Sequence, residues 1–507
     1  MNKDWKSAMQ RKFIIIGMDD NRTPFFPPEV LEHIRQGKVF SGGVRHKEIV
    51  GGLLPDDAIW ISITVPLDNV FAQYERVFAQ NEKVLIRDEK VLVQDERVFT
   101  RDEKVLVQNE CVSTRDEKVL IQNESLSTQH EKAPAVSGTV RNGTEDNNPA
   151  GQIIVFASGD PLFFGFANTV RRKLPDAAIT LYPSFNSLQV LAHRLVMPYD
   201  DMRTVSLTGR PWHEFDRALI ERTPKIGILT DREHTPAAIA ARMLEYGYRH
   251  YTMYVGEHLG NPGKERIRRM TLEEAVLGTF EHPNNLLLCA CSPGEASGQA
   301  CHEYVYSPLP ARPFGIPDGL FAHLDGRARM ITKAPIRLLT LQALELNRRR
   351  VFWDVGFCTG SVSIEARLQF PHLTVVSFEI RAEGEELMNI NSRRFGAPGI
   401  TAIIGDFLQA ETGTLPRPDA VFIGGHGGHL PEMLMKIKEV LLPGGCVVFN
   451  SVSAESRQAF AEGAEAAGME LQPSVHIALN DYNPIEIMKA VSPEMKVVSS
   501  EMKIVSS

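Results

Sequence analysis

Residues 351–365 read VFWDVGFCTGSVSIE, an apolar strand pattern that runs into a glycine-bearing turn and then into a helix pattern. Gly356 and Gly360 allow the backbone to approach a ligand closely, because glycine has no Cβ. The N-terminus of the following helix offers N–H groups that have no partner inside the helix. With Asp354 at the strand end and Thr359 in the turn, the segment predicts a binding site for a nucleotide-bearing ligand.

Two more acids follow the next apolar runs. Glu379 ends TVVSFE, where its carboxylate can accept hydrogen bonds from both hydroxyls of an adenosine ribose. Asp406 follows ITAIIG, where it can hold the adenine amino group. Strand patterns recur in DAVFIGGHGG and LLPGGCVVF. This order favours an S-adenosylmethionine site on a Rossmann-like sheet over a dehydrogenase site, with another Rossmann-like nucleotide site as the alternative.

His426 lies in the GGHGG segment and is the catalytic candidate of this half of the chain. Its imidazole could lie over a substrate ring; a plain loop histidine is the alternative. Enzymes that methylate exocyclic amines often carry an Asn/Asp-Pro-Pro-Tyr tetrad at this place. That tetrad is absent here, and the small, flexible GGHGG segment suits a large planar substrate better.

A second group of such residues lies nearer the N-terminus. The apolar run IIVFA leads into a turn that contains Ser158, Gly159, Asp160 and Phe163. Arg45 and His46 follow another strand end, in FSGGVRHKEIVGG. Arginine binds carboxylates in a bidentate manner, so Arg45, Arg210 and Arg329 are candidates to hold an acidic substrate. The alternative is a solvated loop for Arg45 and His46, and a plain surface position for each of the other two arginines.

Strand and helix signals alternate along most of the chain, which predicts an α/β fold with parallel sheets. A length of 507 residues exceeds that of one ordinary domain. We expect a first domain at residues 11–291, a proline-bearing linker at 292–313, a second domain at 314–491 and a repeat-bearing tail at 492–507.

Residues 74–129 repeat every seven residues, as in NEKVLIR, DEKVLVQ and DERVFTR. A heptad suggests a coiled coil, but these apolar residues are consecutive, so a helix would spread them over more than half of its circumference. In a strand, the odd period would turn successive units to opposite faces. We therefore predict that residues 74–150 are a surface insertion and polar linker, with an oligomerisation or partner-binding segment as the alternative.

The segment GIPDGLFAHLDGRARMITKAPIRLLTLQAL precedes the glycine turn. Together with DVGFCTGSVSIEA and DAVFIGGHGG, it resembles the decarboxylating precorrin methyltransferase family that modifies carbon 15 of the ring, over residues 314 to about 490. The resemblance implies a class I methyltransferase fold with Thr332 at the methyl donor. Phe357 and Cys358 stand where the family usually has small residues, and their bulk could narrow the approach to the methionine end of the donor.

Residues 12–72 and 151–291 contain VFASGDPLFFG, YPSFNSLQVLAHRL, VSLTGRP and IGILTDREHTPAAIAARML. They resemble the tetrapyrrole methylase superfamily, and within it the precorrin methylase of carbon 5. The resemblance implies two α/β lobes with the donor in the cleft between them. It implies a donor pocket formed by Ser158, Gly159, Asp160, Phe163, Asn186, Ser187 and Asp231. The turn at residues 17–21 departs from the family's glycine- and proline-rich pattern, which bears on substrate placement.

Taken together, the resemblances imply a bifunctional C-methyltransferase with two S-adenosylmethionine sites. It would methylate a (cobalt-)precorrin-6/7 at C5 and C15 and decarboxylate the C12 acetate, in cobalamin biosynthesis. A methyltransferase for RNA or protein is one alternative, and a non-catalytic tetrapyrrole- or donor-binding regulator is another. The expected partner is a small-molecule corrin precursor, and homo-oligomerisation stays open.

Composition narrows these choices. A net charge of −8 and a pI of about 6.0 argue against a nucleic-acid partner, which needs a basic face. No apolar run reaches the ~18 residues of a membrane span, and the charged N-terminus lacks a signal core, so we expect a cytoplasmic protein. Cys289 and Cys291 share one strand face, where core thiols are expected rather than a metal site.

Overall fold

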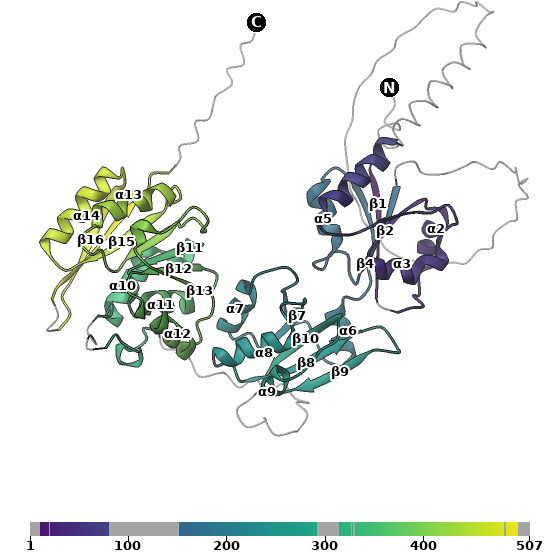
Figure 1. Ribbon diagram of the computed structural model, residues 1–507, viewed down its shortest axis with the longest axis horizontal. Helices are drawn as coiled ribbons and strands as arrows, with labels where there is room; N and C mark the ends of the chain where they lie inside the picture. The colour runs from purple at the N-terminus through teal and green to yellow at the C-terminus, as the bar shows by residue number, and fades with distance from the viewer. Residues whose placement is uncertain are drawn as a thin grey trace, which may run out of the picture. The chain divides into compact units, whose positions relative to one another are not determined.

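The computed structural model describes residues 11–19, 21–80, 152–291, 314–325, 327, 330–480 and 483–494. These residues form an α/β protein with three sheets (Figure 1). The chain divides into two compact units, Met1–Phe185 and Asn186–Ser507. This division falls inside the predicted first domain. Each of the two parts into which it divides that domain contains one sheet. Of the described helices, none is long and apolar enough to cross a bilayer.

The first unit contains a sheet in which every pair of neighbouring strands is parallel, in the order β3-β2-β4-β1-β5. Its strands are β1 (Lys12–Met18), β2 (Val39–Gly42), β3 (Ile59–Ser62), β4 (Gln152–Ser158) and β5 (Ala178–Tyr182). Along β1, Phe13 and Ile15 enter one hydrophobic cluster, whereas Ile14 and Ile16 enter another. The continuous apolar run FIII therefore reflects burial on both faces of the sheet.

The helices of this unit cover those two faces. They are α2 (Pro28–Gln36), α3 (Val44–Val50), the 3-10 turn η1 (Gly51–Leu53) and α5 (Phe166–Lys173). Residues 68–80 are also helical, and Tyr74 and Phe78 are buried in the same cluster as α5. The first heptad unit therefore belongs to a core helix and not to a surface insertion. The rest of the predicted insertion, residues 81–150, lies outside the described residues.

The second sheet has the order β6-β7-β10-β8-β9, and only β6 and β7 pair in parallel. Its strands are β6 (Arg203–Ser206), β7 (Lys225–Leu229), β8 (Tyr251–Glu257), β9 (Arg266–Met270) and β10 (Asn284–Ala290). Its helices are α6 (Ser187–Arg194), α7 (His213–Ile220), α8 (Pro236–Glu245) and α9 (Leu272–Val276). Cys289 is buried on β10, where its sulfur lies 3.7 Å from that of Met197.

The third sheet has the order β13-β12-β11-β14-β15-β17-β16, in which the first five strands are parallel. Its strands are β11 (Val351–Val355), β12 (Thr374–Glu379), β13 (Ile400–Ile404), β14 (Ala420–Ile423), β15 (Cys446–Ser451), β16 (Glu470–Ile477) and β17 (Ile485–Val491). Val355 pairs with both Phe378 and Ile423. The turns after β11, β12 and β14 therefore leave the sheet at one edge.

Helices cover both faces of this sheet. They are α10 (Ala334–Leu344), α11 (Ser361–Gln369), α12 (Glu383–Phe395), α13 (Leu430–Val440) and α14 (Ala454–Ala466), with 3-10 turns η2 (Asp318–Leu320), η3 (Leu346–Arg348) and η4 (Phe407–Gln409). Figure 1 shows α13 and α14 on one side and α10, α11 and α12 on the other. Neighbouring Phe352 and Trp353 enter opposite clusters, as the predicted Rossmann-like arrangement requires.

Candidate active site

The glycine turn after β11 lies against the loop that follows β14. Gly356 adopts a φ of +82°, and a Cβ on it would lie 2.7 Å from the backbone nitrogen of Gly425. A Cβ on Gly424 would lie 2.8 Å from the carbonyl oxygen of Gly356. The close approach of the two loops therefore requires these glycines. It occurs beside β11, at the point where the strand order reverses and open α/β sheets bind ligands.

Gly360 ends the turn at the N-terminus of α11. Its φ is +73°, and a Cβ on it would lie 2.8 Å from the sulfur of Met388. The turn is thus fixed on one side by the β14 loop and on the other by α12.

Glu379 connects the end of β12 to this turn. It is buried, and its Oε2 accepts a 2.8 Å hydrogen bond from the backbone N–H of Cys358. Its Oε1 accepts 3.0 Å bonds from the backbone N–H and the guanidinium of Arg381. Three of the roughly four acceptor positions of the carboxylate are therefore used by the protein, and one remains for a ligand.

Two cavities adjoin at the glycine turn. The first, the Glu379 cavity, has a volume of about 360 Å³ and is lined by Glu379, Asp406 and His426 among others. The second, the Asp354 cavity, has a volume of about 450 Å³ and is lined by Thr332, Asp354 and Thr359 among others. Both cavities are bounded by Met330, Gly356, Cys358 and Gly424. A ligand that passes Gly356 can therefore occupy both.

Two residues that line the Asp354 cavity each have a buried polar atom without a partner among the described residues. Oδ2 of Asp354 accepts bonds from the backbone N–H and the hydroxyl of Ser363. Across the described part of the chain, no group bonds to Oδ1 of Asp354 or to Oγ1 of Thr359. A buried polar atom without a partner costs about 1–3 kcal/mol, which points to a ligand that supplies the missing bonds.

The environment of Asp354 favours its neutral form. Burial raises the pKa of this carboxyl, the two bonds from Ser363 lower it, and the negative charge of Glu379 raises it, for a net pKa of about 7. A cation at the open oxygen would stabilise the charged carboxylate and lower that pKa. Asp354 is therefore suited to bind a positively charged group.

Phe357 and Cys358 occupy the turn in different ways. Phe357 is buried in a cluster with Ile331, Ile364 and Met388, so most of its ring belongs to the core. Cys358 adopts a φ of +50° and lines both cavities, and its thiol donates to the carbonyl of Met330 at 3.3 Å. Burial raises the pKa of this thiol, followed by the effect of Glu379. Cys358 is thus the side chain at the passage between the cavities, whereas Phe357 lines only the Asp354 cavity.

Three other predicted residues line the cavities, and a fourth is not among the described residues. His426 is half-buried, and its Nδ1 accepts a 3.1 Å bond from the N–H of Gly428. Burial lowers the pKa of His426, followed by the effect of His429. Asp406 is exposed and caps η4 through a 2.9 Å bond from Leu408. Thr332 is half-buried, and Arg329 lies outside the described residues.

In the first unit, the structure brings Arg45 and His46 to Ser158. The guanidinium of Arg45 donates to Oγ of Ser158 at 2.9 Å, and Nε2 of His46 lies 3.0 Å from the same oxygen. The N–H of Gly43 donates to Nδ1 of His46 at 3.2 Å, so Nε2 carries the proton of the neutral ring. Ser158 therefore accepts two bonds, and its own hydroxyl proton is available to an acceptor.

The turn at Ser158 is held by close backbone contacts. Gly159 adopts a φ of +62°, and its N–H donates to the carbonyl of Met18 at 2.7 Å. A Cβ on Gly17 would lie 2.2 Å from the carbonyl oxygen of Gly159, which explains the glycine at the end of β1. Oδ1 of Asp160 accepts a 2.8 Å bond from the N–H of Leu162, as in an Asx turn, with Phe163 next along the chain.

The second unit contains the other predicted donor residues of the first domain. Asn186 caps α6, whose first residue is Ser187, by accepting bonds from the N–H groups of Leu188 and Gln189. Burial raises the pKa of Asp231, but bonds from His234, Gly209 and Glu233 outweigh it and lower the pKa to about 2. Arg210 donates to the hydroxyl of Ser206, the last residue of β6. Their contact with a ligand stays a prediction.

Sequence reasoning missed part of the Asp354 cavity. Lys333 continues the Thr332 wall, and Asn450 and Asn483 line the cavity from the end of β15 and the loop before β17. The side chain of Asn450 donates to Thr340 at 3.0 Å. A strand-end position signals Asn450, but nothing in the sequence near Asn483 indicates a site.

Comparisons with known proteins agree with this geometry. Residues 320–503 match the family described as "Precorrin methyltransferase domain", and residues 63–276 match "Tetrapyrrole (Corrin/Porphyrin) Methylases". A precorrin-6Y C(5,15)-methyltransferase [decarboxylating] of Sinorhizobium sp is 34% identical over 303 residues, which are 60% of this chain and 69% of the relative. The chain belongs to the precorrin-6Y C(5,15)-methyltransferase (decarboxylating) family.

Two further relatives are each similar to about a third of this family member. A cobalt-precorrin-6B C(15)-methyltransferase (decarboxylating) of Salmonella typhimurium is 36% identical over 168 residues, which are 33% of this chain and 85% of the relative. The crystal structure of a precorrin-6Y C5,15-methyltransferase from Geobacter metallireducens is 30% identical, with a TM-score of 0.33, and covers 36% of this chain and 100% of that one. The two family models show a methyltransferase with a domain of each kind, as the motifs predicted.

Proposed function

We propose that this chain methylates one tetrapyrrole twice, at C5 through the domain at residues 11–291 and at C15 through the domain at residues 314–491, with decarboxylation of the C12 acetate at the second. The relatives' names provide the substrate class, a (cobalt-)precorrin-6/7 of cobalamin biosynthesis. One observation carries the proposal: the Glu379 and Asp354 cavities meet at the glycine turn, and Asp354 and Thr359, which line the second, have buried polar atoms without a partner in the described part of the chain.

The donor's adenosine fits the Glu379 cavity. Glu379 would accept from the ribose hydroxyls, and Asp406 would lie beside the adenine amino group. Only one acceptor position of Glu379 is open, so the second ribose hydroxyl would displace the guanidinium of Arg381. That side chain is 37% exposed and can turn into solvent at little cost.

The donor's methionine fits the Asp354 cavity. Its ammonium group would bind Oδ1 of Asp354, and the hydroxyl of Thr359 would form a hydrogen bond to the same ligand. Gly356 and Gly360 provide the close backbone approach, and Thr332 belongs to the opposite wall. This assignment accounts for the two buried atoms and for the raised pKa of Asp354.

Bound S-adenosylmethionine would supply an electrophilic methyl group on a sulfonium. The chain's own residues would align that group with a ring carbon and exclude water, since a carbon nucleophile and a good leaving group need no dedicated base. The apolar walls contributed by Met330, Ile331 and Phe357 suit this task. His426, whose pKa is lowered, would act as a neutral hydrogen-bond donor through Nε2 near the acetate, and the ring would be the electron sink for decarboxylation.

The first domain would contain the second donor site. Its donor residues are Ser158, Gly159, Asp160, Phe163, Asn186, Ser187 and Asp231. Substrate carboxylates would bind Arg45, His46 and Arg210 in this domain and Arg329 in the other. The proton that Ser158 has left to donate supports a role for it toward a carboxylate or another acceptor.

Mass spectrometry of precorrin-6 or cobalt-precorrin-6, incubated with the chain and S-adenosylmethionine, tests the proposal. We expect a gain of two methyl groups and the loss of one carboxyl group, and the form accepted identifies whether the substrate contains cobalt. Asp160→Ala should remove only the C5 methyl, and Glu379→Ala only the C15 methyl and the decarboxylation. A chain that binds the donor but alters neither substrate contradicts the proposal and favours an RNA, protein or regulatory target.

A further inference from the structure

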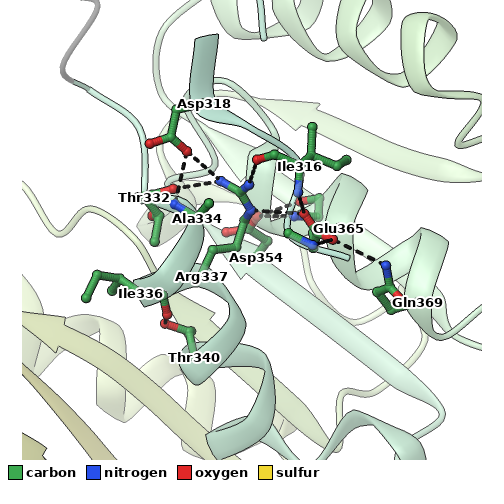
Figure 2. Close-up of polar contacts among 12 residues, drawn as sticks. Ile316, Asp318, Thr332, Ala334, Ile336, Arg337, Thr340, Asp354, Glu365 and Gln369 are labelled. Carbon is green, nitrogen blue, oxygen red and sulfur yellow. Dashed lines mark hydrogen bonds and ion pairs between the residues drawn. The ribbon is translucent and has the colours of Figure 1, made fainter. Parts of the chain in front are cut away.

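A buried ionic cluster lies behind the Asp354 cavity. The side chain of Arg337, on α10, is fully buried and forms an ion pair with the fully buried Glu365 of α11, with Nε and Oε2 3.3 Å apart. Nη1 of the same guanidinium lies 3.3 Å from Oδ1 of Asp318. Figure 2 shows these three side chains converging from different segments of the domain. A charge buried this deeply persists only where its hydrogen bonds are satisfied.

The guanidinium also binds the backbone of two segments. Nη1 of Arg337 donates to the carbonyl of Thr332 at 2.8 Å, and Nη2 donates to the carbonyl of Ile316. The N–H groups of Gly315 and Ile316 in turn donate to Glu365 at 3.1 and 2.8 Å. Oδ1 of Asp318 accepts from the N–H of Ala334 at 3.0 Å, which holds the first turn of α10 (Figure 2).

These bonds connect the walls of the cavity to each other. Thr332 and Lys333 line the cavity directly ahead of α10. Glu365 lies one turn into α11, the helix that begins at Ser361 and carries the partner of Asp354, Ser363. In the described residues around the cluster, Arg337 is the group that contacts both the Thr332 carbonyl and α11.

We propose that Arg337 is a positioning residue for the decarboxylating methylation: its buried guanidinium sets the Thr332 wall of the Asp354 cavity relative to the donor-binding turn. It does not touch the reacting atoms and acts through the carbonyl of Thr332 and the carboxylate of Glu365. The planar fork of arginine can reach all four acceptors at once, which the single ammonium of lysine cannot. The inference rests on the proposed function, because it assumes that the donor binds at this turn.

The chain provides a matched control on α11, the helix that also carries Glu365. The side chain of Arg367 is also fully buried, and it donates to the carbonyls of Pro398, Pro371 and Leu373. It lines neither the Asp354 nor the Glu379 cavity. Its replacement should therefore reproduce the loss of a buried arginine without moving the Thr332 wall.

The test compares Arg337→Lys and Arg337→Met with Arg367→Lys and Arg367→Met in the full chain. The donor concentration that gives half-maximal release of CO₂ is measured at saturating tetrapyrrole, and C5 methylation in the same sample is the internal control. We expect the Arg337 variants to raise that concentration about tenfold or more, since small displacements in a site have large effects. The Arg367 variants, and C5 methylation in all four, should stay within about twofold of the unaltered chain. Equal shifts at both arginines overturn the inference.

Asp318→Ala tests the cluster from its more exposed side if the Arg337 variants do not fold. The side chain of Asp318 is 26% exposed, so this variant should fold, and we expect about a threefold rise in the half-maximal donor concentration. No rise in a folded Asp318→Ala chain overturns the inference. If the unaltered chain releases no CO₂, the proposed function fails instead. In that case, photocrosslinking of labelled S-adenosylmethionine to residues 314–491 measures donor binding directly. The Arg337 and Arg367 variants are then compared by the donor concentration that gives half-maximal crosslinking.

Discussion

The glycine-bearing turns after β11 and after β4 differ in how deeply their polar side chains are buried. The turn after β11 lies between strand ends of one sheet, where Asp354 is 1% exposed and has an oxygen without a protein partner among the described residues. The turn after β4 has an exposed Ser158 whose oxygen is already bonded by Arg45 and His46. The deeper turn can bind a charged group strongly because its surroundings exclude water, at the expense of stability.

The largest expected effect concerns the stability that the folded chain loses because the carboxyl group of Asp354 is buried. The pKa of Asp354 is about 7 in the folded chain, against an ordinary value of 3.8. The stability that the raised pKa contributes is fully present below pH 3.8 and is lost as the pH rises through 7. Relative to pH 3.8 and below, ionisation of Asp354 should lower the free energy of unfolding by about 4 kcal/mol at pH 8. Asp354→Asn should raise the Tm by several degrees at pH 8, measured by calorimetry, and by less at pH 5.

The same substitution should also weaken the binding of the methyl donor. Oδ1 then belongs to an amide and no longer attracts a cation, so the donor concentration for half-maximal CO₂ release should rise. For the unaltered chain, that concentration should fall as the pH rises from 6 to 8. The exposed Asp406→Asn serves as the control for stability and should leave the Tm at pH 8 within about a degree. An unchanged Tm for Asp354→Asn would show that the buried carboxyl group does not destabilise the folded chain.

Glu379→Ala should have the next largest effect. It removes the acceptor of the Cys358 N–H together with the proposed acceptor of the ribose, each a charge-assisted bond. We expect the rate of decarboxylating methylation per donor concentration to fall about 100-fold, or about 3 kcal/mol, while C5 methylation persists. Product analysis by mass spectrometry measures both reactions in one sample. Equal losses of the two methyl groups would contradict separate sites.

Gly356→Ala tests the contact between the two loops. Its Cβ would meet the backbone of Gly425 at 2.7 Å, and the φ of +82° is unfavourable for alanine. We expect a loss of about 2 kcal/mol in the free energy of unfolding, measured with urea. Gly468→Ala is the control: its φ is +64°, but nothing lies within 4 Å of the added Cβ, so the loss should be about 1 kcal/mol.

Ser158→Ala should have the smallest effect, because the turn after β4 is more exposed. It removes one neutral donor, so we expect the rate of C5 methylation per substrate concentration to fall by about fivefold to tenfold, with C15 methylation unchanged. The control is Ser41→Ala in the same unit. That hydroxyl donates to the carbonyl of Ile61, so its loss should lower the Tm without a change in C5 methylation. A larger effect of Ser158→Ala on C15 methylation would contradict the assignment.

The sequence by itself determined which residues stand at the strand ends. Asp354, Gly356 and Glu379 could be placed because local apolar patterns show where strands stop, and neighbouring parallel strands end at one edge of a sheet. The same local reasoning placed the turn at Ser158. It failed at the heptad repeat, where the pattern of YERVFAQ suggested a surface segment although Tyr74 and Phe78 are buried in a helix.

Only the tertiary structure decided how these residues are used. No local pattern shows that an oxygen of Asp354 lacks a partner, that Arg45 and His46 meet Ser158 across more than 100 residues, or that Arg337 binds Thr332 and Glu365 together. Nor does a local pattern bring Asn483 into the Asp354 cavity. Hydrogen-bond satisfaction and burial depend on packing between distant segments, whereas strand ends and turns depend on a few adjacent residues.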